Sequence, residues 1–208
     1  LYVGNHSGGL ATPDSFLFSA HLHAARGMAD MPYGLGHEVA ISLPGISQII
    51  VPLGAVRASH DNARRLFERG HKVFVYPGGD ADNMRPWRDR DRIEFAGRKG
   101  YIRLALREGV PIIPVVTAGG HSTFVVIDDM KGLARAVRAK RWLRAEVLPL
   151  SLSVPWGLTL GPIMPFPLPS RIITEVLEPI TFDRDGEEAA TDDDYVLECD
   201  EHVRDTMQ

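Results

Sequence analysis

A histidine and an aspartate near the start of the chain have the types and spacing of a catalytic acid–base pair. The chain opens with LYVGNHSGGLATPDSFLF, in which His6 follows a short apolar run and Asp14 comes eight positions later. An imidazole acting as a general base needs its far nitrogen held, which a carboxylate accepting the Nδ1 proton achieves. Gly8 and Gly9 permit the sharp turn that would bring the two side chains together. The alternative is that Asp14 only stabilises the first turn of a helix and that His6 is an unrelated loop residue.

A glycine-rich strand end in the middle of the chain forms a second candidate group. The stretch VYPGGDADNMRPW places Gly78 and Gly79 after a buried strand, followed by Asp80, Asp82 and Arg85. Backbone N–H groups at such a strand end can bind an anion or an oxyanion, and an arginine can bind phosphate. Gly78, Gly79, Asp80 and Arg85 are therefore candidate substrate contacts. The alternative is an exposed charged loop, which the mixture of both charge signs favours.

Two cations at the start of a later helix form a third candidate group. Arg98 and Lys99 stand at the start of the pattern RKGYIRLALREG, where the helix dipole disfavours positive charge. Their placement indicates an anionic ligand or, alternatively, ion pairs with the acids at positions 89, 91 and 94. His121 follows a Gly-Gly pair after another buried strand. We expect a turn histidine, and the alternative is that its side chain reaches the edge of the site.

Short apolar runs alternate with helical patterns along the chain. Thr12 and Pro13 predict a helix entry with Thr12 as the N-cap, and Gly27 predicts the end of that helix. The expected helices span about 13–26, 61–70, 98–109 and 192–207, with short helices between 36 and 53. The expected strands span 1–4, 54–57, 72–77, 111–116, 122–127 and 171–180, with a long polar loop at 80–97. This order predicts an α/β protein, with a mostly parallel central sheet flanked by helices, in a single domain over residues 1–208.

The composition restricts the class of protein. The 208 residues are 44% apolar and 24% charged, which suffices for a buried core in one domain. A net charge of −4 gives no case for nucleic-acid binding. The single cysteine, Cys199, excludes an internal disulfide and permits a reducing compartment. Residue 1 is not methionine and lies in an expected strand, so we expect that an N-terminal segment precedes it.

Residues 131–169 have the composition of a membrane-contacting segment. The stretch KGLARAVRAKRWLR contains six cations and predicts an amphipathic helix over 131–144 with Lys131, Arg135 and Arg138 on one face. An apolar stretch over 147–169 follows, but proline and glycine interrupt it, so a regular membrane-spanning helix is not expected. A basic helix beside an apolar aromatic segment is typical of proteins on an anionic bilayer surface. The alternative is an ordinary exposed helix followed by core strands.

Four sequence blocks in a fixed order resemble the phospholipid/glycerol acyltransferase family. These blocks are NHSGG, the Gly-Ala strand LGAVRAS, YPGG, and GRKGYIRLAL with VPIIPVV, and they lie within roughly residues 1–130. The resemblance implies a glycerolipid-acyltransferase domain that moves a fatty acyl group from acyl-CoA or acyl carrier protein to a hydroxyl of a glycerolipid or lysophospholipid. It also implies that His6 deprotonates the acceptor hydroxyl and that Asp14 orients His6.

The resemblance further implies partners and a location. The partners are acyl-CoA or acyl carrier protein, a lipid acceptor and a membrane surface, with no nucleic acid. Acyl-CoA is then a co-substrate, and no metal and no resident cofactor is expected. The expected location is the cytoplasmic face of a membrane, by peripheral or monotopic association.

Two departures from the family pattern leave alternatives open. Four residues usually separate the family's histidine and aspartate, whereas seven separate His6 from Asp14, and Ala11 stands at the usual position. Gly78 stands where the third block has a glutamate, and an arginine directly after that block is absent. This weakens the case for a glycerol-phosphate acceptor unless Asp80 or Arg85 compensates, and the pattern also resembles the diacylglycerol-acyltransferase-like branch, whose acceptor is a neutral lipid. The alternatives are a catalytically silent lipid-binding protein of this fold and a hydrolase of thioesters or esters.

Overall fold

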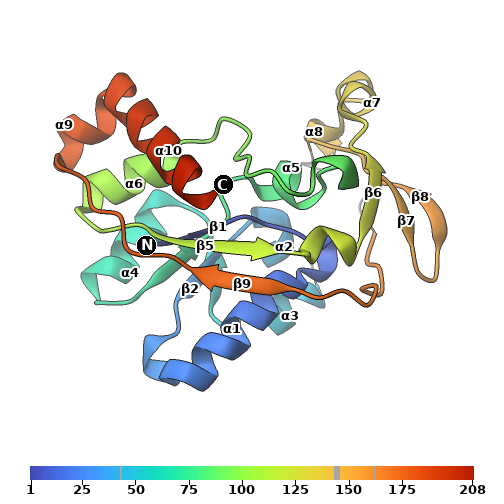
Figure 1. The fold of residues 1–208 in the computed structure, drawn as a ribbon, viewed down its shortest axis with the longest axis horizontal. Helices are drawn as coiled ribbons and strands as arrows, with labels where there is room; N and C mark the ends of the chain where they lie inside the picture. Colours follow the sequence, from blue (N-terminus) through green and yellow to red (C-terminus); the bar gives the residue numbers. More distant parts are fainter. Residues whose placement is uncertain (43, 143–145, 162) are drawn as a thin grey trace.

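A six-stranded, mostly parallel sheet forms the centre of the protein (Figure 1). The computed structural model describes residues 1–208 except residues 43, 143–145 and 162. The strand order is β3-β2-β4-β1-β5-β9, and β9 runs antiparallel to β5 at one edge. The strands are β1 (Tyr2–Gly4), β2 (Tyr33–Gly36), β3 (Ala55–Arg57), β4 (Val73–Val75), β5 (Ile113–Ala118) and β9 (Ile173–Val176). The α/β class with a mostly parallel sheet, predicted from the alternating patterns, is confirmed.

Helices cover both faces of this sheet because side chains alternate between its faces along each strand. On one face, Val3 and Val73 belong to the main core with apolar residues of four helices. These helices are α4 (His60–Glu68), α6 (Gly100–Glu108), α9 (Gly186–Thr191) and α10 (Asp193–Met207). On the other face, Tyr2 and Phe74 pack with Phe18 of α1 (Pro13–Arg26). Figure 1 shows α1 on one side of the sheet and α6, α9 and α10 on the other.

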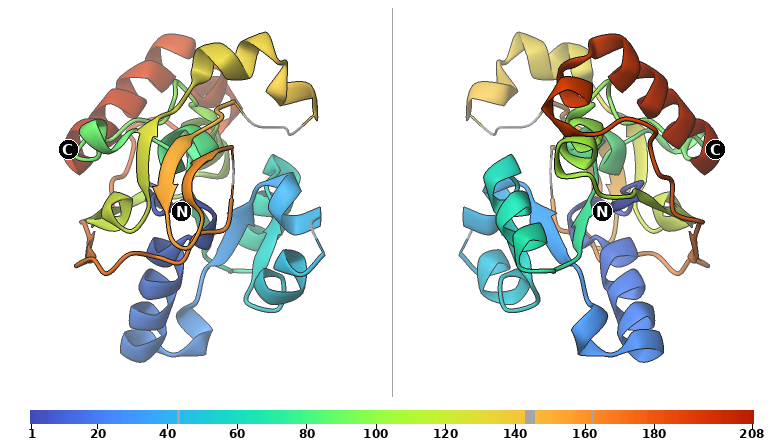
Figure 2. Two further views of the ribbon diagram at one scale, coloured as in Figure 1. Left: turned by 90° about the vertical axis from the view of Figure 1, so that its right-hand side faces the viewer. Right: turned by 90° about the vertical axis from the view of Figure 1, so that its left-hand side faces the viewer.

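A second, three-stranded sheet lies beyond the carboxyl ends of the parallel strands (Figures 1 and 2). It consists of the antiparallel strands β6 (Val125–Asp128), β7 (Leu150–Ser153) and β8 (Gly157–Leu160), in that order. Helices α7 (Lys131–Ala136) and α8 (Ala139–Trp142) follow β6. A small core of Met84, Phe124, Val126 and Val147 joins this sheet to the end of α5 (Gly79–Asn83).

Short helices fill the remaining connections. They are the α-helices α2 (Glu38–Ser42) and α3 (Ile46–Ile50) and the 3-10 helices η1 (Gly9–Ala11), η2 (Met28–Asp30), η3 (Trp87–Asp89) and η4 (Gly120–Ser122). The loop expected at 80–97 thus contains one turn of helix α5 and the turn η3. The strand expected at 122–127 begins three residues later, because η4 occupies the start of that range.

The first helix begins and ends as predicted, but its cap differs. The N–H of Gly27 donates to the carbonyl of His23 at 2.8 Å and ends α1. Thr12 occupies the N-cap position, yet its side chain makes no capping bond. Its φ of 41° places it in the left-handed region, which the tight approach from η1 requires.

The predicted membrane-contacting segment folds differently from the expectation. The single helix expected over 131–144 is two short helices, because the chain turns at Arg138, whose φ is 54°. Lys131 and Arg135 lie in α7, whereas Arg138 lies outside it, and positions 143–145 lie outside the described residues. The apolar stretch after it forms the β7–β8 hairpin. Among the described residues, no helix is both long and apolar enough to cross a bilayer.

Candidate active site

Three neighbouring parallel strands deliver polar side chains to one edge of the central sheet. Strands β4, β1 and β5 lie side by side, and Tyr76, His6 and His121 follow their carboxyl ends. Ligands of open α/β sheets bind at this edge. Asn5 fixes the end of β1, because its amide donates to the carbonyl of Thr117 and accepts from the N–H of Thr117, both at 2.8 Å. His6 therefore leaves the sheet at a defined point.

His6 and Asp14 form the hydrogen-bonded pair that their types and spacing suggested. Nδ1 of His6 lies 2.9 Å from Oδ2 of Asp14. The Asp14 side chain is fully buried, whereas 14% of the His6 side chain is exposed. Oδ2 of Asp14 also accepts the N–H of Ser7 at 2.7 Å, and Oδ1 accepts the N–H of Ser15 at 2.8 Å. Asp14 thus contacts the imidazole and also stabilises the first turn of α1, so its role is not confined to the helix and His6 is not an unrelated loop residue.

The turn between these residues closes because two glycines adopt left-handed backbone conformations. Their φ values are 89° at Gly8 and 64° at Gly9. A Cβ at Gly9 would lie 2.6 Å from the ring of Phe124, so only glycine fits there. Nδ2 of Asn83 donates to the carbonyl of Gly9 at 3.0 Å and ties the turn to α5. The turn η1 takes up the additional residues, which is how a seven-residue separation still brings the pair together.

The imidazole of His6 is held on its face as well as at Nδ1. It stacks on the ring of Tyr76 with 4.1 Å between centroids and 15° between planes. Oγ of Ser15 donates to the hydroxyl oxygen of Tyr76 at 3.1 Å. Burial by itself lowers the pKa of His6, but the charge and hydrogen bond of Asp14 outweigh it, so the pKa is raised above 6.5. No described residue hydrogen-bonds Nε2, so this nitrogen is available to exchange a proton with a substrate.

A buried network of Asp82, Arg85 and His121 supports the loop that carries His6. Oδ2 of Asp82, in α5, accepts the backbone N–H of His6 at 2.6 Å. Oδ1 of Asp82 lies 2.9 Å from Nη2 of Arg85, and Nη2 lies 3.1 Å from Nε2 of His121. The remaining amino group of Arg85 donates to the carbonyl of Arg92. Because arginine only donates, Nε2 of His121 is the acceptor and this imidazole is neutral.

Burial shifts the pKa values of this network in opposite directions. It raises the pKa of Asp82 to about 6, against the lowering effect of Arg85. It lowers the pKa of His121 to about 3, with a further contribution from the charge of Arg85. His121 lies in the turn η4, as expected, and its buried side chain also joins the network beside His6. The sequence did hold a signal for it and for Asp82, because both follow strands that could neighbour β1.

Two of the predicted substrate contacts, Gly78 and Gly79, lie in the turn at the start of α5. The N–H of Gly79 donates to the carbonyl of Tyr76 at 3.2 Å and is not available for an oxyanion. A Cβ at Gly78 would lie 2.3 Å from Cβ of Asp82. The glutamate that the family has at this position is therefore sterically excluded while Asp82 keeps its place.

The cations at the start of α6 differ in their surroundings. Arg98 donates to the carbonyl of Gly78 at 2.9 Å and pairs with Asp80 at 3.0 Å and Glu146 at 2.9 Å. These are not the acids at positions 89, 91 and 94 that were considered as partners. Lys99 is the N-cap residue of α6 and is partly exposed. Of the six predicted contacts, Arg85 is the one that enters the network beside His6.

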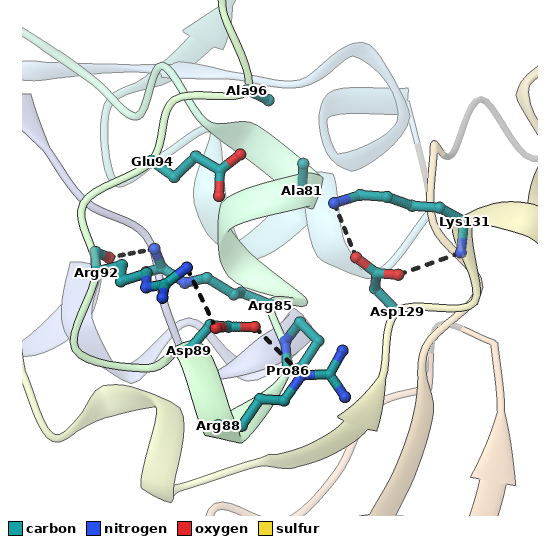
Figure 3. Close-up of a pocket in the computed structure, with 10 residues that line it drawn as sticks. All are labelled: Ala81, Arg85, Pro86, Arg88, Asp89, Arg92, Glu94, Ala96, Asp129 and Lys131. Atoms are coloured by element: carbon teal, nitrogen blue, oxygen red, sulfur yellow. Dashed lines mark hydrogen bonds and ion pairs between the residues drawn. The ribbon is translucent and has the colours of Figure 1, made fainter.

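Arg85 also lines a polar pocket of about 210 Å³ (Figure 3). In Figure 3, Arg92 pairs with Asp89 and Lys131 with Asp129 around this pocket, at 3.6 Å and 2.8 Å. The charged lining suits a polar group and not an acyl chain. Within the described part of the chain, no cluster of three His, Cys, Asp or Glu side chains could hold a metal ion.

Comparison with known proteins supports this fold. The crystal structure of the 1-acyl-sn-glycerophosphate acyltransferase PlsC from Thermotoga maritima superimposes with a TM-score of 0.50, over 99% of this chain and 64% of that chain, at 16% identity. The two chains therefore share a fold. A family model described as diacylglycerol acyltransferase matches residues 39–196. The chain belongs to the diacylglycerol acyltransferase family, although His6 and Asp14 precede the matched range.

Individual relatives agree with this family. Diacylglycerol O-acyltransferase 2 of Homo sapiens is 25% identical over 83% of this chain and 50% of that protein. An uncharacterised protein of Mycobacterium tuberculosis is 28% identical over the whole of this chain and 55% of that protein. The chain therefore spans about half the length of the curated relatives it matches.

Proposed function

We propose that this protein transfers a fatty acyl group from a thioester donor, acyl-CoA or acyl carrier protein, to a hydroxyl of a glycerolipid. The observation that carries the proposal is the 2.9 Å contact between Nδ1 of His6 and the buried carboxylate of Asp14. This geometry leaves Nε2 as the base nitrogen. It is the arrangement that general-base activation of a hydroxyl requires.

The proposed reaction is a direct transfer. Nε2 of His6 takes the proton of the acceptor hydroxyl while the oxygen of that hydroxyl attacks the carbonyl carbon of the thioester. The carbon–sulfur bond breaks, and the protonated imidazole returns the proton to the departing thiolate. Asp14 holds the productive tautomer and stabilises the imidazolium that forms between these steps. Stacking on Tyr76 keeps the ring in one plane.

The partners follow from the family and the charges near the site. Human diacylglycerol O-acyltransferase 2 is named for a neutral acceptor, and a neutral glycerolipid acceptor is what we propose here. Arg98 and Lys99 at the start of α6, with Arg85 at the polar pocket, are the proposed contacts for phosphate groups of the donor. A lipid acceptor also requires access to a membrane, and we propose association with its cytoplasmic face.

The test is to replace the proposed base, His6, and to compare this variant with a matched replacement of another histidine. We expect His6→Ala to lower acyl transfer by about 10²- to 10⁴-fold, the usual contribution of a general base. His21→Ala is the control, because His21 is an exposed histidine of α1. The measurement is the esterified lipid formed by purified protein from labelled acyl-CoA and diacylglycerol, with melting temperatures to verify folding. Full turnover by folded His6→Ala would overturn the proposal.

The same assay separates the alternatives. Release of free fatty acid that does not depend on a lipid acceptor would identify a hydrolase. Absence of both products, with retained binding of acyl-CoA or lipid, would identify a silent lipid-binding protein. Esterified acceptor formed in proportion to consumed thioester supports transfer.

A further inference from the structure

The β7–β8 hairpin has its apolar side chains on the exposed face, whereas an ordinary surface strand pair has them on the buried face. In β7, Ser151 and Ser153 point inward and are buried, whereas Leu152 is 52% exposed. Antiparallel sheets with one solvated face normally show the opposite alternation, with apolar residues inside. The pattern is therefore inverted.

Apolar residues of all three strands share one face of the second sheet, on which Leu152 and Leu158 are exposed and Val125 is half-buried. Val125, Leu152 and Leu158 are directly paired across β6, β7 and β8, so their side chains share a face. Leu158 is 64% exposed and Leu160, two residues on, is 54% exposed. Further exposed apolar residues border this row at the end of β6, in the hairpin turn and in the segment after it. These are Ile127, Val154, Trp156, Met164 and Phe166. We call these nine residues the hairpin face.

The hairpin face carries no charged side chain. The sequence from 147 to 170 contains no Asp, Glu, Lys, Arg or His. Nε1 of Trp156, which is 62% exposed, donates to the carbonyl of Met164 at 3.1 Å. The indole can thus enter an apolar medium without losing a hydrogen bond to water. A contiguous exposed apolar patch on a protein surface marks an interaction site.

Cations border the hairpin face on one side. Helices α7 and α8 lie beside the second sheet (Figures 1 and 2), and Ala134 and Ala139 pack on Leu148 just before β7. Arg135 and Arg138 are exposed there. Over residues 131–171 the sequence has seven cations and one acid, Glu146. An apolar face with a cationic border matches the interface of an anionic bilayer, where apolar groups enter the acyl region and cations meet headgroups.

We propose that the hairpin face docks this protein onto the surface of an anionic lipid bilayer. A second copy of the chain fits less well, because pairing two such faces would bring two cationic borders around one small interface. This docking proposal rests on the proposed function, because transfer to a lipid acceptor gives the protein a reason to bind a bilayer. The face is also on the correct side, because Met84 and Val126 join the second sheet to α5, whose Asp82 holds the loop of His6.

The experiment measures binding of the purified chain to vesicles of phosphatidylcholine, with and without phosphatidylglycerol. We expect binding that strengthens with phosphatidylglycerol and weakens with salt. Leu158→Ser should weaken it at least about tenfold, since it removes a leucine that the bilayer would bury. Leu53→Ser is the matched control, because Leu53 is 65% exposed but lies between α3 and β3. This control should bind as the unmodified chain does.

Three results would overturn the docking proposal. They are no vesicle binding by the unmodified chain, equal losses in both serine variants, and a change in oligomeric state produced by Leu158→Ser alone, which would identify a face between copies. His6→Ala should bind vesicles normally, so a failure of docking and a failure of catalysis are distinguishable. Quenching of Trp156 fluorescence by brominated lipid should accompany binding, and Trp156→Phe should remove that signal.

Discussion

At the scale of single residues, the site depends on the carboxylate of Asp14, which the imidazole of His6 and two backbone N–H groups share. Asp14 is fully buried and accepts hydrogen bonds from Nδ1 of His6 and from two backbone N–H groups. The charge and the hydrogen bond of Asp14 raise the pKa of His6 against the effect of burial. The tautomer and the basicity of His6 therefore have one common cause.

This shared role makes a prediction for the pH dependence of transfer. A base works when it is deprotonated, so kcat/KM should fall as pH falls through the raised pKa of His6. In Asp14→Asn the raising effect is lost while burial remains, so the acidic limb should move to lower pH. The rate at its optimum should also fall, by about 10³-fold or more, because the tautomer is no longer fixed.

The measurement is the pH profile of kcat/KM for both proteins. Asp61→Asn serves as the control, since Asp61 is an exposed acid of α4 with 77% of its side chain accessible. An acidic limb at the same pH in Asp14→Asn and in the unmodified protein would show that Asp14 does not set the basicity of His6.

At the scale of elements, the site is held by short turns that touch each other closely. The turn η4 after β5 and the loop after β1 meet at Gly120, where an added Cβ would lie 1.9 Å from Oγ of Ser7. The N–H of Ser7 is in turn bonded to Asp14. A change in η4 is therefore transmitted to the catalytic pair through one residue.

Gly120→Ala tests this contact. The new methyl must displace Ser7, so we expect kcat/KM to fall by about 10- to 100-fold and stability to fall by about 1–3 kcal/mol. Gly132→Ala is the matched control, because a Cβ at Gly132 would meet no atom within 4 Å and the residue lies in α7. Its stability should be unchanged or higher. Equal behaviour of the two alanine variants would contradict the proposed coupling.

At the scale of the whole molecule, the chemistry and the hairpin face occupy the same end. The carboxyl edge of the central sheet points toward the second sheet, and α5 lies between them (Figure 1). The Arg85–His121 contact joins α5 to the segment that leads from the central sheet into β6. It therefore contributes to the stability of the entire fold.

This contact predicts a loss of stability in acid. The folded-state pKa of His121 is lowered to about 3, so its stabilising contribution is full above its unfolded value of 6.5 and falls as pH drops toward 3. The loss at pH 5 should be about 2 kcal/mol. His121→Gln keeps an acceptor for Arg85 without a titrating group, so its stability should fall less between pH 7 and pH 5.

Denaturant unfolding at several pH values measures this difference. Asp82 has the opposite sign, because its folded-state pKa is raised and its contribution is lost as pH rises toward 6, but it is present in both proteins. His23→Gln, at an exposed position of α1, is the control and should follow the unmodified protein. Parallel curves for His121→Gln and the unmodified protein would refute the assignment of His121 as a neutral buried acceptor.

The sequence by itself determined the class of fold and the position of the candidate site. Apolar runs alternating with helical patterns specify the strands and helices locally. Glycines mark where these elements end, as Gly27 does for α1. It also placed His6 at a strand end with Asp14 at the next helix, because both signals are local. It missed β2, whose sequence YGLG has no apolar run.

Only the tertiary structure decided which of these residues meet. Asp82 contacts the backbone of His6 from 76 positions away, and His121 joins the same network through Arg85. They meet because β4 and β5 flank β1, and strand order is not encoded in any local pattern. The same holds for the hairpin face. An apolar stretch broken by proline predicts neither strand register nor which side faces solvent, since a shift of one residue would turn every leucine inward.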